Sequence, residues 1–339
     1  MPEHRRTLIR ACRCAAAVAV TFPLAMCAPA PPVVVSAPSP ALRLAEGAAA
    51  PAVTRGAAVS DHVVVTSIDG LRPDAIGRFG AHTLGRLARE GSASFQARTI
   101  LPSKTLPSHT SMLTGVDPAT HGITWNENET DVHGVVASPT IFATAHAAGL
   151  TTAAFFSKGK FNHLLVPGTL DHGVAPEGDG RWLAGTTVRN VERYLEEGRP
   201  NLMFVHIGEP DDAGHVTGWM SPVYAIAVQR ADGAVRRVLA AADRAFGEGR
   251  YTVIVTADHG GHGLRHGSSD PRDVTIPWIA WGRGVKTGNT LASGIHTVDT
   301  AATALWLLGV AENVEGQPVL AAIAAPPPVR AVAAAGGAR

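Results

Sequence analysis

Three carboxylates and two histidines stand where they could bind divalent metal ions. Asp69, Asp211 and Asp258 each lie at or just beyond the end of a strongly apolar run. His259 adjoins the last of them, and His215 lies four residues after Asp211, so that one tight or helical turn could aim both side chains at one ion. Carboxylates held close together in a low-dielectric site repel each other, and a bound cation removes that repulsion. Mixed imidazole and carboxylate ligands suit zinc, with manganese or iron as alternatives.

A hydroxyl in segment 102–109 could serve as a nucleophile. Thr105 lies just before a predicted helix, where free backbone N–H groups and the positive end of the helix dipole favour an anion such as phosphate. A threonine hydroxyl is a poor nucleophile by itself, but a coordinated divalent ion lowers the pKa of a bound hydroxyl. The spacing alone is equally compatible with Thr105 or Ser108 acting only as a helix cap.

The elements that must position these residues alternate along the chain. Apolar runs predict strands at 63–68, 93–100, 151–156, 201–207, 251–257 and 276–281. Amphipathic patterns predict helices at 84–90, 107–114, 140–148, 187–197, 223–245 and 298–308. This alternation predicts one α/β domain, with a mostly parallel central sheet and helices on both faces. Ligands of such sheets bind beyond the carboxyl ends of the strands, so we expect the three carboxylates to meet there.

Composition excludes several classes of protein. The chain has 339 residues, 29 Lys and Arg against 28 Asp and Glu, and 45% hydrophobic residues. That hydrophobic content excludes wholesale disorder, and the near-neutral charge argues against a nucleic-acid-binding surface. The cysteines are Cys12, Cys14 and Cys27, so disulfides and thiolate metal sites are excluded from the rest of the chain.

The two ends of the chain are predicted to lie outside the folded domain. Residues 1–27 have the basic start and short apolar stretch of an export signal, and they end in a sequence similar to a lipoprotein cleavage site at Cys27. Cleavage near Ala30 without a lipid is the alternative. Residues 28–60 and 325–339 are rich in Ala and Pro and predict a disordered tether and tail. The domain is therefore expected at 61–324, in a bacterial protein that is periplasmic, on the cell surface or secreted.

Several segments together resemble the alkaline phosphatase superfamily, and within it the type I phosphodiesterase/nucleotide pyrophosphatase branch. The resemblance extends from residue 62 to about 310 and rests on the order and spacing of short segments. These segments are 67–73, 102–109, 114–118, 121–126, 209–215 and 258–260. It implies an alkaline phosphatase-like fold and a small phosphorylated substrate. It also implies a phosphoric ester hydrolase with two divalent ions, best matched by zinc, and a covalent phosphothreonyl intermediate.

The resemblance also assigns roles to individual residues. One ion would be held by Asp69, Thr105, Asp258 and His259, and the other by Asp211, His215 and His266. Thr105 would be the nucleophile, and Asn126 would bind a non-bridging phosphate oxygen, assisted by the backbone N–H of Leu106. His266 is chosen because of its distance before Gly282; His262 and then His296 are the alternatives.

The chain departs from the family pattern at positions that affect the substrate. The family usually has Phe after the nucleophile, where it can stack on a nucleobase, and this chain has Leu106. Hydrolysis of phosphate monoesters or phosphonates is therefore an alternative, and a non-catalytic protein that binds or transfers phosphorylated headgroups is a weaker one. Lys104, Arg181 and the loop 157–181 either contact substrate or form a solvated surface. His109 and His121 are predicted to be structural.

Overall fold

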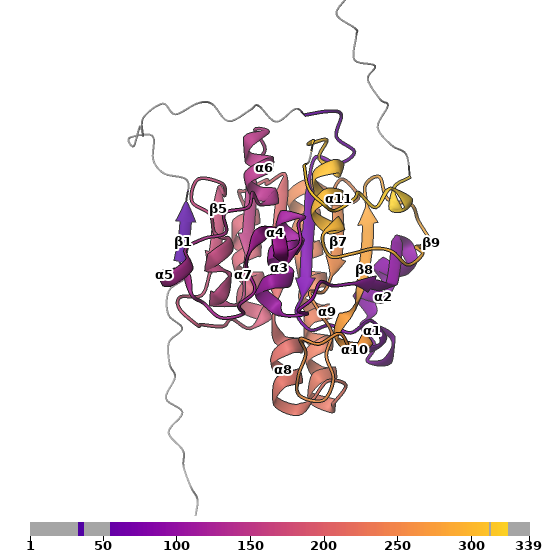
Figure 1. Ribbon diagram of the computed structural model, residues 1–339. Coiled ribbons are helices and arrows are strands. Elements are labelled where there is room, and N and C mark those ends of the chain that lie inside the picture. The colour runs from indigo at the N-terminus through magenta and orange to yellow at the C-terminus, as the bar shows by residue number, and fades with distance from the viewer. Residues whose placement is uncertain (1–32, 37–54, 312, 325–339) are drawn as a thin grey trace, which may run out of the picture. The chain divides into compact units, whose positions relative to one another are not determined.

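A nine-stranded mixed sheet forms the centre of the part of the chain that the computed structural model describes, residues 33–36, 55–311 and 313–324 (Figure 1). In spatial order the strands are β1 (Val33–Ser36), β5 (His172–Ala175), β4 (Thr152–Phe155), β6 (Leu202–Ile207), β2 (Val63–Ile68), β7 (Thr252–Thr256), β8 (Thr275–Gly282), β3 (Ser92–Arg98) and β9 (Asn289–Thr290). All pairs from β5 to β7 are parallel, whereas β8 runs antiparallel to both β7 and β3. The prediction of a mostly parallel sheet is confirmed.

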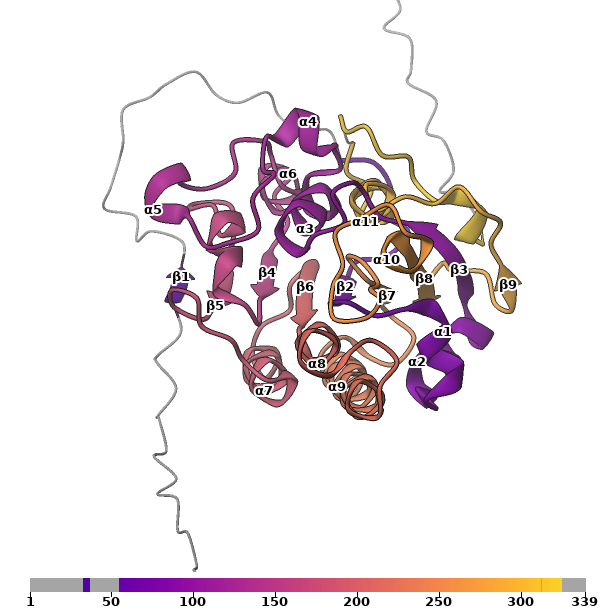
Figure 2. The same ribbon diagram turned by 60° about the horizontal axis from the view of Figure 1, so that its bottom comes forward.

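Helices cover both faces of this sheet (Figure 2). One face carries α1 (Pro73–Arg78), α2 (His82–Glu90), α7 (Ala184–Leu195), α8 (Glu209–Thr217) and α9 (Pro222–Phe246). The other carries α3 (Thr105–Thr114), α4 (Pro118–His121), α6 (Ile141–Ala147) and α11 (Asp299–Leu307). Shorter helices are α5 (Thr130–His133), α10 (Pro271–Val274) and the 3₁₀ turns η1 (Gly159–Leu164) and η2 (Leu320–Ala322). This layered α/β arrangement is the one that the alternating pattern predicts.

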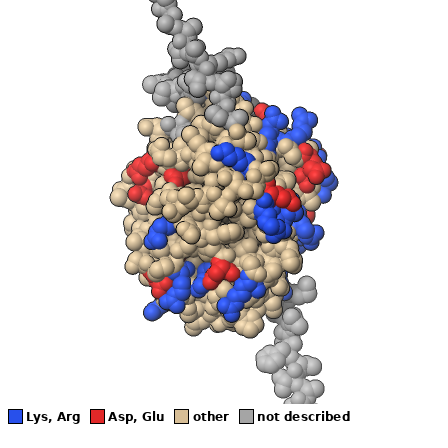
Figure 3. Space-filling view, turned by 90° about the vertical axis from the view of Figure 1, so that its right-hand side faces the viewer, with Lys and Arg blue, Asp and Glu red and all other residues tan. Residues whose placement is uncertain are grey.

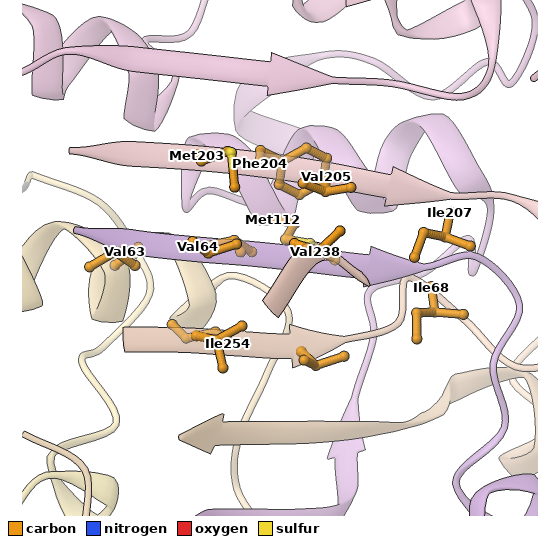
Figure 4. Packing of buried hydrophobic residues seen from close by; sticks show 14 of the residues in the cluster. Val63, Val64, Ile68, Met112, Met203, Phe204, Val205, Ile207, Val238 and Ile254 are labelled. Carbon is orange, nitrogen blue, oxygen red and sulfur yellow. The ribbon is translucent and has the colours of Figure 1, made fainter. Parts of the chain in front are cut away.

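The core lies where the central parallel strands contact helices of both layers (Figure 4). All six residues of β2 and all six of β6 are buried, because each strand is covered on both faces. Val64 pairs with Met203 of β6 and with Val253 of β7. Met112 of α3 and Val238 of α9 are buried in the same cluster. The central strands are thereby fixed in position, and so are the residues at their carboxyl ends.

Two helices differ in detail from the sequence-based prediction. α3 begins at Thr105 rather than at residue 107, because Lys104 in an extended conformation already precedes the first turn. Helix α8 follows β6 almost directly and carries Asp211 in its first turn and His215 near its end. The sequence predicts a tight or helical turn between Asp211 and His215; in the structure both residues belong to the nine-residue helix α8.

The N-terminal boundary of the domain differs from the expected one at residue 61. Gly56 and Val59 donate backbone hydrogen bonds to Gly309 and Leu307, at 2.6 and 2.8 Å, so the chain is already attached to the end of α11 there. Backbone pairing of this kind does not require large apolar side chains, which is why composition missed it. Strand β1, which lies within the expected tether 28–60, also pairs with β5 through its backbone.

The predicted export signal, Cys27 and the tail 325–339 lie outside the described residues. Within the described ranges, no helix has the length and hydropathy needed to cross a membrane.

Charged side chains of opposite sign lie close to one another over the surface. Figure 3 shows Lys and Arg interspersed with Asp and Glu on the face that it draws. Arg86 and Glu90 pair along α2 at 2.8 Å, and Arg237 of α9 pairs with Glu192 of α7 at 2.5 Å. On that face, neither sign of charge forms a continuous field.

A carboxylate from α9 caps the start of α2. The residue preceding that helix is Ala81, which cannot cap it. The buried side chain of Asp232 accepts hydrogen bonds from the backbone N–H groups of Thr83 and Leu84, at 3.1 and 2.8 Å. These are two of the donors that a helix leaves unpaired at its first turn. Asp232 therefore connects α9 to the first turn of α2.

We expect Asp232→Ala to lower the free energy of unfolding by about 1–2 kcal/mol, because two helix donors lose their acceptor. Asp232→Asn keeps an acceptor oxygen and should lose less. Urea denaturation measures both, with the exposed Arg236→Ala on the same helix as the control, expected to change stability by less than about 0.5 kcal/mol. Equal stability of Asp232→Ala and the control would contradict the capping role.

Candidate metal centre

Four neighbouring parallel strands place charged residues at one edge of the sheet. In spatial order the strands are β4, β6, β2 and β7, and shortly after their carboxyl ends come Lys158, Asp211, Asp69 and Asp258. All four side chains are buried. The three carboxylates expected to meet at this edge do so, and an ammonium from the fourth strand lies with them.

The backbones of two of these carboxylates are in direct contact. The N–H of Asp211 donates to the carbonyl of Asp69 at 3.0 Å. Gly70 lies at this junction with a φ of +70°, and a Cβ there would lie 2.9 Å from the Cα of Asp211. Only glycine accepts both the left-handed conformation and this approach. Asp69 and Asp211 are thus held side by side by the main chain.

Three histidines around these carboxylates have their tautomers set by backbone carbonyls. The Nδ1 atoms of His259, His266 and His215 lie 2.8, 2.8 and 3.0 Å from the carbonyl oxygens of Gly260, Ser103 and Leu264, respectively. A carbonyl only accepts, so each Nδ1 carries the proton and donates it. In the neutral ring, each Nε2 then presents a lone pair, as a metal-binding histidine requires.

The Nε2 atoms of these rings, which carry lone pairs, lie close to one another or to carboxylate oxygens. The Nε2 atoms of His215 and His266 lie 3.1 Å apart, and Asp211 Oδ1 lies 3.3 and 3.5 Å from them. His259 Nε2 lies 3.3 Å from Asp69 Oδ1 and 3.2 Å from Asp258 Oδ2. Lone pairs that face one another repel unless a proton or a cation lies between them.

One oxygen of each carboxylate is buried without a hydrogen-bond donor in the described part of the chain. These atoms are Asp69 Oδ1, Asp211 Oδ1 and Asp258 Oδ2, which are the oxygens that face the histidines. Buried acceptors normally find a donor, because an unsatisfied one costs about 1–3 kcal/mol and more when it is charged. A convergent set of unpaired acceptor atoms fits divalent cations.

The acceptors divide into two groups that share one residue. Asp211, His215 and His266 form one group, and Asp69, Asp211 and His259 form the other; the ligand atoms within each group lie within 4.8 Å of one another. The first group is the set that the resemblance implies for one ion. The second group contains Asp211 together with Asp69 and His259. Asp258 lies next to this group, because its Oδ2 is 3.2 Å from His259 Nε2. The described residues thus contain two candidate metal-binding groups with Asp211 between them.

Opposing electrostatic effects separate the pKa values of the three carboxylates. Burial alone would raise the pKa of Asp69, but the Lys158 ammonium and a hydrogen bond from His206 lower it well below its usual range. Burial and the charge of Asp69 would likewise raise the pKa of Asp211, yet the Lys158 ammonium lowers it. The pKa of Asp258 lies well above its ordinary value because of burial and its two acidic neighbours. Without a further cation, the site therefore has difficulty ionising all three carboxylates.

Thr105 lies at the start of α3, against this cluster. Its side chain is 1% exposed, and its hydroxyl donates to His259 Nε2 at 3.2 Å. Asn126 Oδ1 accepts the backbone N–H of Leu106 at 2.8 Å, which holds the amide beside the first turn of α3. The Leu106 N–H is therefore already paired with Asn126 rather than free for a phosphate oxygen, which corrects the role expected for it.

The alternative histidines lie outside both candidate groups. His262 Nδ1 donates to Asp273 Oδ1 at 2.6 Å, and Asp273 also accepts the N–H of Ser268, so this pair organises the loop that carries His266. The backbone N–H of His296 donates to Asp299 Oδ2 at 2.7 Å, just before α11. Of the three candidates for the last ligand, His266 is the one whose Nε2 reaches Asp211.

His109 and His121 form structural hydrogen bonds around α3. His109 Nδ1 donates to the carbonyl of Thr105 at 2.8 Å, and its Nε2 accepts from Ser67 at 2.8 Å. His121 Nε2 pairs with Ser111 at 3.0 Å. Both rings thus help to fix the helix that carries Thr105.

Lys158 is the residue whose position the sequence reasoning missed. The loop 157–181 was interpreted as a substrate contact or a solvated surface, whereas Lys158 is 3% exposed and its ammonium lies 2.7 Å from Asp69 Oδ2. The signal was available, because Lys158 follows the apolar run 151–156 just as Asp69 follows 63–68. Arg181 is at the surface and pairs with Asp212, and Lys104 precedes the first residue of α3.

A family model described as "Type I phosphodiesterase / nucleotide pyrophosphatase" matches residues 63–270. This range contains the four strands that form the centre and every residue of both candidate metal groups. The chain belongs to this family.

Curated relatives agree with this membership, and a solved structure has a similar fold. The chain is 26% identical over 249 residues to human ectonucleotide pyrophosphatase/phosphodiesterase family member 7, covering 68% of this chain and 54% of the relative. It is 26% identical over 220 residues to human ectonucleotide pyrophosphatase/phosphodiesterase family member 1, covering 57% of this chain and 23% of the relative. It thus spans about half or less of these relatives. A structure of murine ectonucleotide pyrophosphatase/phosphodiesterase 5, an inactive form in complex with AMP, has a TM-score of 0.63 at 16% identity, covering 76% of this chain and 98% of that one. This last likeness shows the alkaline phosphatase-like fold.

Because Asp211 belongs to both groups, we expect Asp211→Asn to lose both metal ions. His215→Gln removes a ligand that is 43% exposed and belongs to one group, so it should lose about one ion. Elemental analysis of zinc-loaded, desalted protein measures the ratio of metal to chain. Loss of a single ion from Asp211→Asn would contradict the sharing of this carboxylate.

The metal-free protein should lose stability in mild acid through His266. Burial and the charge of His259 lower the pKa of His266 to about 3, whereas an unfolded chain has about 6.5. The unfolded state therefore binds a proton that the folded state does not, so this stability is complete above pH 6.5 and is lost as the pH falls toward 3. The loss is about 2 kcal/mol between pH 6.5 and 5. Urea denaturation in a chelator measures the free energy of unfolding at each pH. Between pH 6.5 and 5 this free energy should fall less in His266→Gln than in the wild-type protein, by the amount given, and an equal fall in both proteins would contradict the prediction.

Proposed function

We propose that this chain is an exported, metal-dependent hydrolase of phosphoric diesters or pyrophosphates, with Thr105 as its nucleophile. The observation that carries the proposal is the position of Thr105. Its hydroxyl is buried at the start of α3, and it contacts His259 at the edge of a cluster of unpaired acceptors. Export is supported by the basic and apolar pattern of residues 1–27.

The donor set fits two divalent ions and suits zinc best. Asp211, His215 and His266 would hold one ion, and Asp69, Asp258, His259 and Thr105 would hold the other, with Asp211 between the two. Bound there, such ions lower the pKa of the nucleophilic hydroxyl and neutralise the phosphoryl and leaving oxygens. The backbone carbonyls that hold the histidines fix the direction of each Nε2 before any ligand arrives.

The chain's own groups supply attack and orientation. Thr105 Oγ1 loses its proton and forms the new bond to phosphorus, while the bond to the leaving oxygen breaks and that group departs as its alcohol or phosphate. From a diester or pyrophosphate this gives a threonyl phosphoester that still carries the second substituent; water then hydrolyses it, which releases the phosphate monoester and restores the hydroxyl. The Asn126 oxygen is engaged by the Leu106 N–H, so its amide hydrogens are free to donate to a phosphoryl oxygen. His109, which accepts from Ser67 and donates to the Thr105 carbonyl, keeps the attacking residue in place.

Two features bear on the substrate. Leu106 is fully buried in the core, so the position after the nucleophile has no surface on which a nucleobase could stack. We therefore propose selection by the phosphoryl group rather than by a base, although relatives carry nucleotide pyrophosphatase names. The Lys158 ammonium adds a positive charge to the centre, which favours doubly charged phosphoryl groups. Monoester or phosphonate hydrolysis is for this reason the second candidate.

We expect Thr105→Ala to lower kcat for an aryl phosphodiester at least about a thousandfold, while both metal ions and the fold are retained, because only the attacking oxygen is lost. Thr105→Ser keeps a hydroxyl and should keep measurable activity. Steady-state kinetics of the zinc-loaded protein, with elemental analysis in parallel, checks this.

The matched control is Ser103→Ala, a buried hydroxyl close to the nucleophile that bonds to the Ser268 carbonyl instead of facing the cluster. It should lose far less activity than Thr105→Ala. Full activity of Thr105→Ala would remove the covalent mechanism. A strong preference of the wild-type protein for an aryl monoester or phosphonate over the diester would instead select the second candidate.

A further inference from the structure

Lys158 is buried in the candidate metal centre, on the side of the Oδ2 atoms of Asp69 and Asp211. It follows β4, and its backbone forms a bridge with Arg181. Its ammonium lies 2.7 Å from Asp69 Oδ2, 2.5 Å from Asp211 Oδ2 and 3.8 Å from Asp212 Oδ1. The family model and the relatives' names assign nothing to this side chain, and in the proposed function only its charge enters, with no chemical step assigned to it.

The two oxygens of Asp69 and of Asp211 have different partners. Lys158 takes the Oδ2 atom of Asp69 and of Asp211, whereas the Oδ1 atoms have no donor in the described part of the structure. His206 Nε2 also contacts Asp69 Oδ2, at 3.2 Å, and Ser157 holds the other nitrogen of that ring at 2.7 Å. The protein thereby satisfies one oxygen of each carboxylate and leaves the other facing the histidines.

The charge balance explains why a lysine is buried at this point. A buried carboxylate without a counter-charge costs several kcal/mol, and so does a buried ammonium. Asp69 and Asp211 lie side by side, and with Asp258 they would give three like charges in one low-dielectric site. The ammonium of Lys158 contacts two of the three and supplies an opposite charge at that point.

We propose that Lys158 is a positioning residue that acts as a built-in cation of the metal centre. Its ammonium holds the Oδ2 atoms of Asp69 and Asp211 and offsets part of the charge gathered there before any ion is bound, so that the chain folds without metal and presents preformed ligand oxygens. In a centre without this lysine, the bound ions would supply all of the compensating charge, and folding would depend on them.

The test compares thermal unfolding in excess chelator with unfolding at saturating zinc, at pH 7.5. In Lys158→Met and Lys158→Gln the metal-free form should lose much more stability than the loaded form. The zinc-induced rise in Tm should therefore be at least twice that of the wild-type protein. Removing a cation beside the ligand carboxylates also strengthens zinc binding, which adds to the rise. Lys158→Arg keeps the charge and should return the rise toward the wild-type value.

The control is Lys286→Met, an exposed lysine whose ammonium donates to the Ala321 carbonyl and has no contact with the centre, which should keep the wild-type zinc-induced rise. A purely structural role of Lys158 predicts that both forms lose stability equally, and that result would overturn the proposal. So would variants that fail to fold even at saturating zinc, because the ions should replace the missing charge. An unchanged rise with a large loss of turnover would assign Lys158 to substrate binding instead. None of these readouts requires Thr105 to be the nucleophile.

Discussion

The structure depends on one electrostatic constraint: three buried carboxylates share a space too small for their charges. Asp69, Asp211 and Asp258 converge because the parallel strands that precede them end at the same edge of the sheet. Repulsion at these distances in a low-dielectric interior exceeds what a fold of ordinary stability tolerates without compensation. The chain supplies one cation of its own, and the remaining unpaired oxygens fit ions from outside.

Much of the surrounding architecture serves to keep this arrangement rigid. Backbone carbonyls from two loops, the one before α3 and the one between β7 and α10, hold the Nδ1 atoms of His215, His259 and His266, so these rings need no reorganisation to bind metal. Gly70 lets the end of β2 approach the first turn of α8, which sets the distance between Asp69 and Asp211. The elements far from the centre, such as the Asp232 cap on α2, stabilise the layers that hold these loops.

The sequence could predict the elements and the convergence, because both follow from periodic patterns and the rule for strand ends. It could not separate His266 from His262. Each lies in a glycine-rich segment, and only the fold shows that Asp273 is the partner of His262. Lys158 was missed for a different physical reason: a lysine in a loop is usually solvated, and burial of its ammonium is favourable only when two carboxylates from other strands surround it. The attachment of residues 56–60 to α11 rests on backbone hydrogen bonds, which leave no trace in composition.

The fold and the ligand set do not by themselves define the substrate, because one architecture can host several chemistries. Two features of this chain lie beside the candidate metal centre. The side chain after Thr105 is packed into the core rather than exposed to a base, and a protein cation stands behind two of the metal-binding carboxylates. The first leaves no surface for stacking a nucleobase at this position, and the second adds a positive charge beside the candidate ligands. These two features are the grounds on which we propose recognition of the charge on phosphorus rather than of the group attached to it.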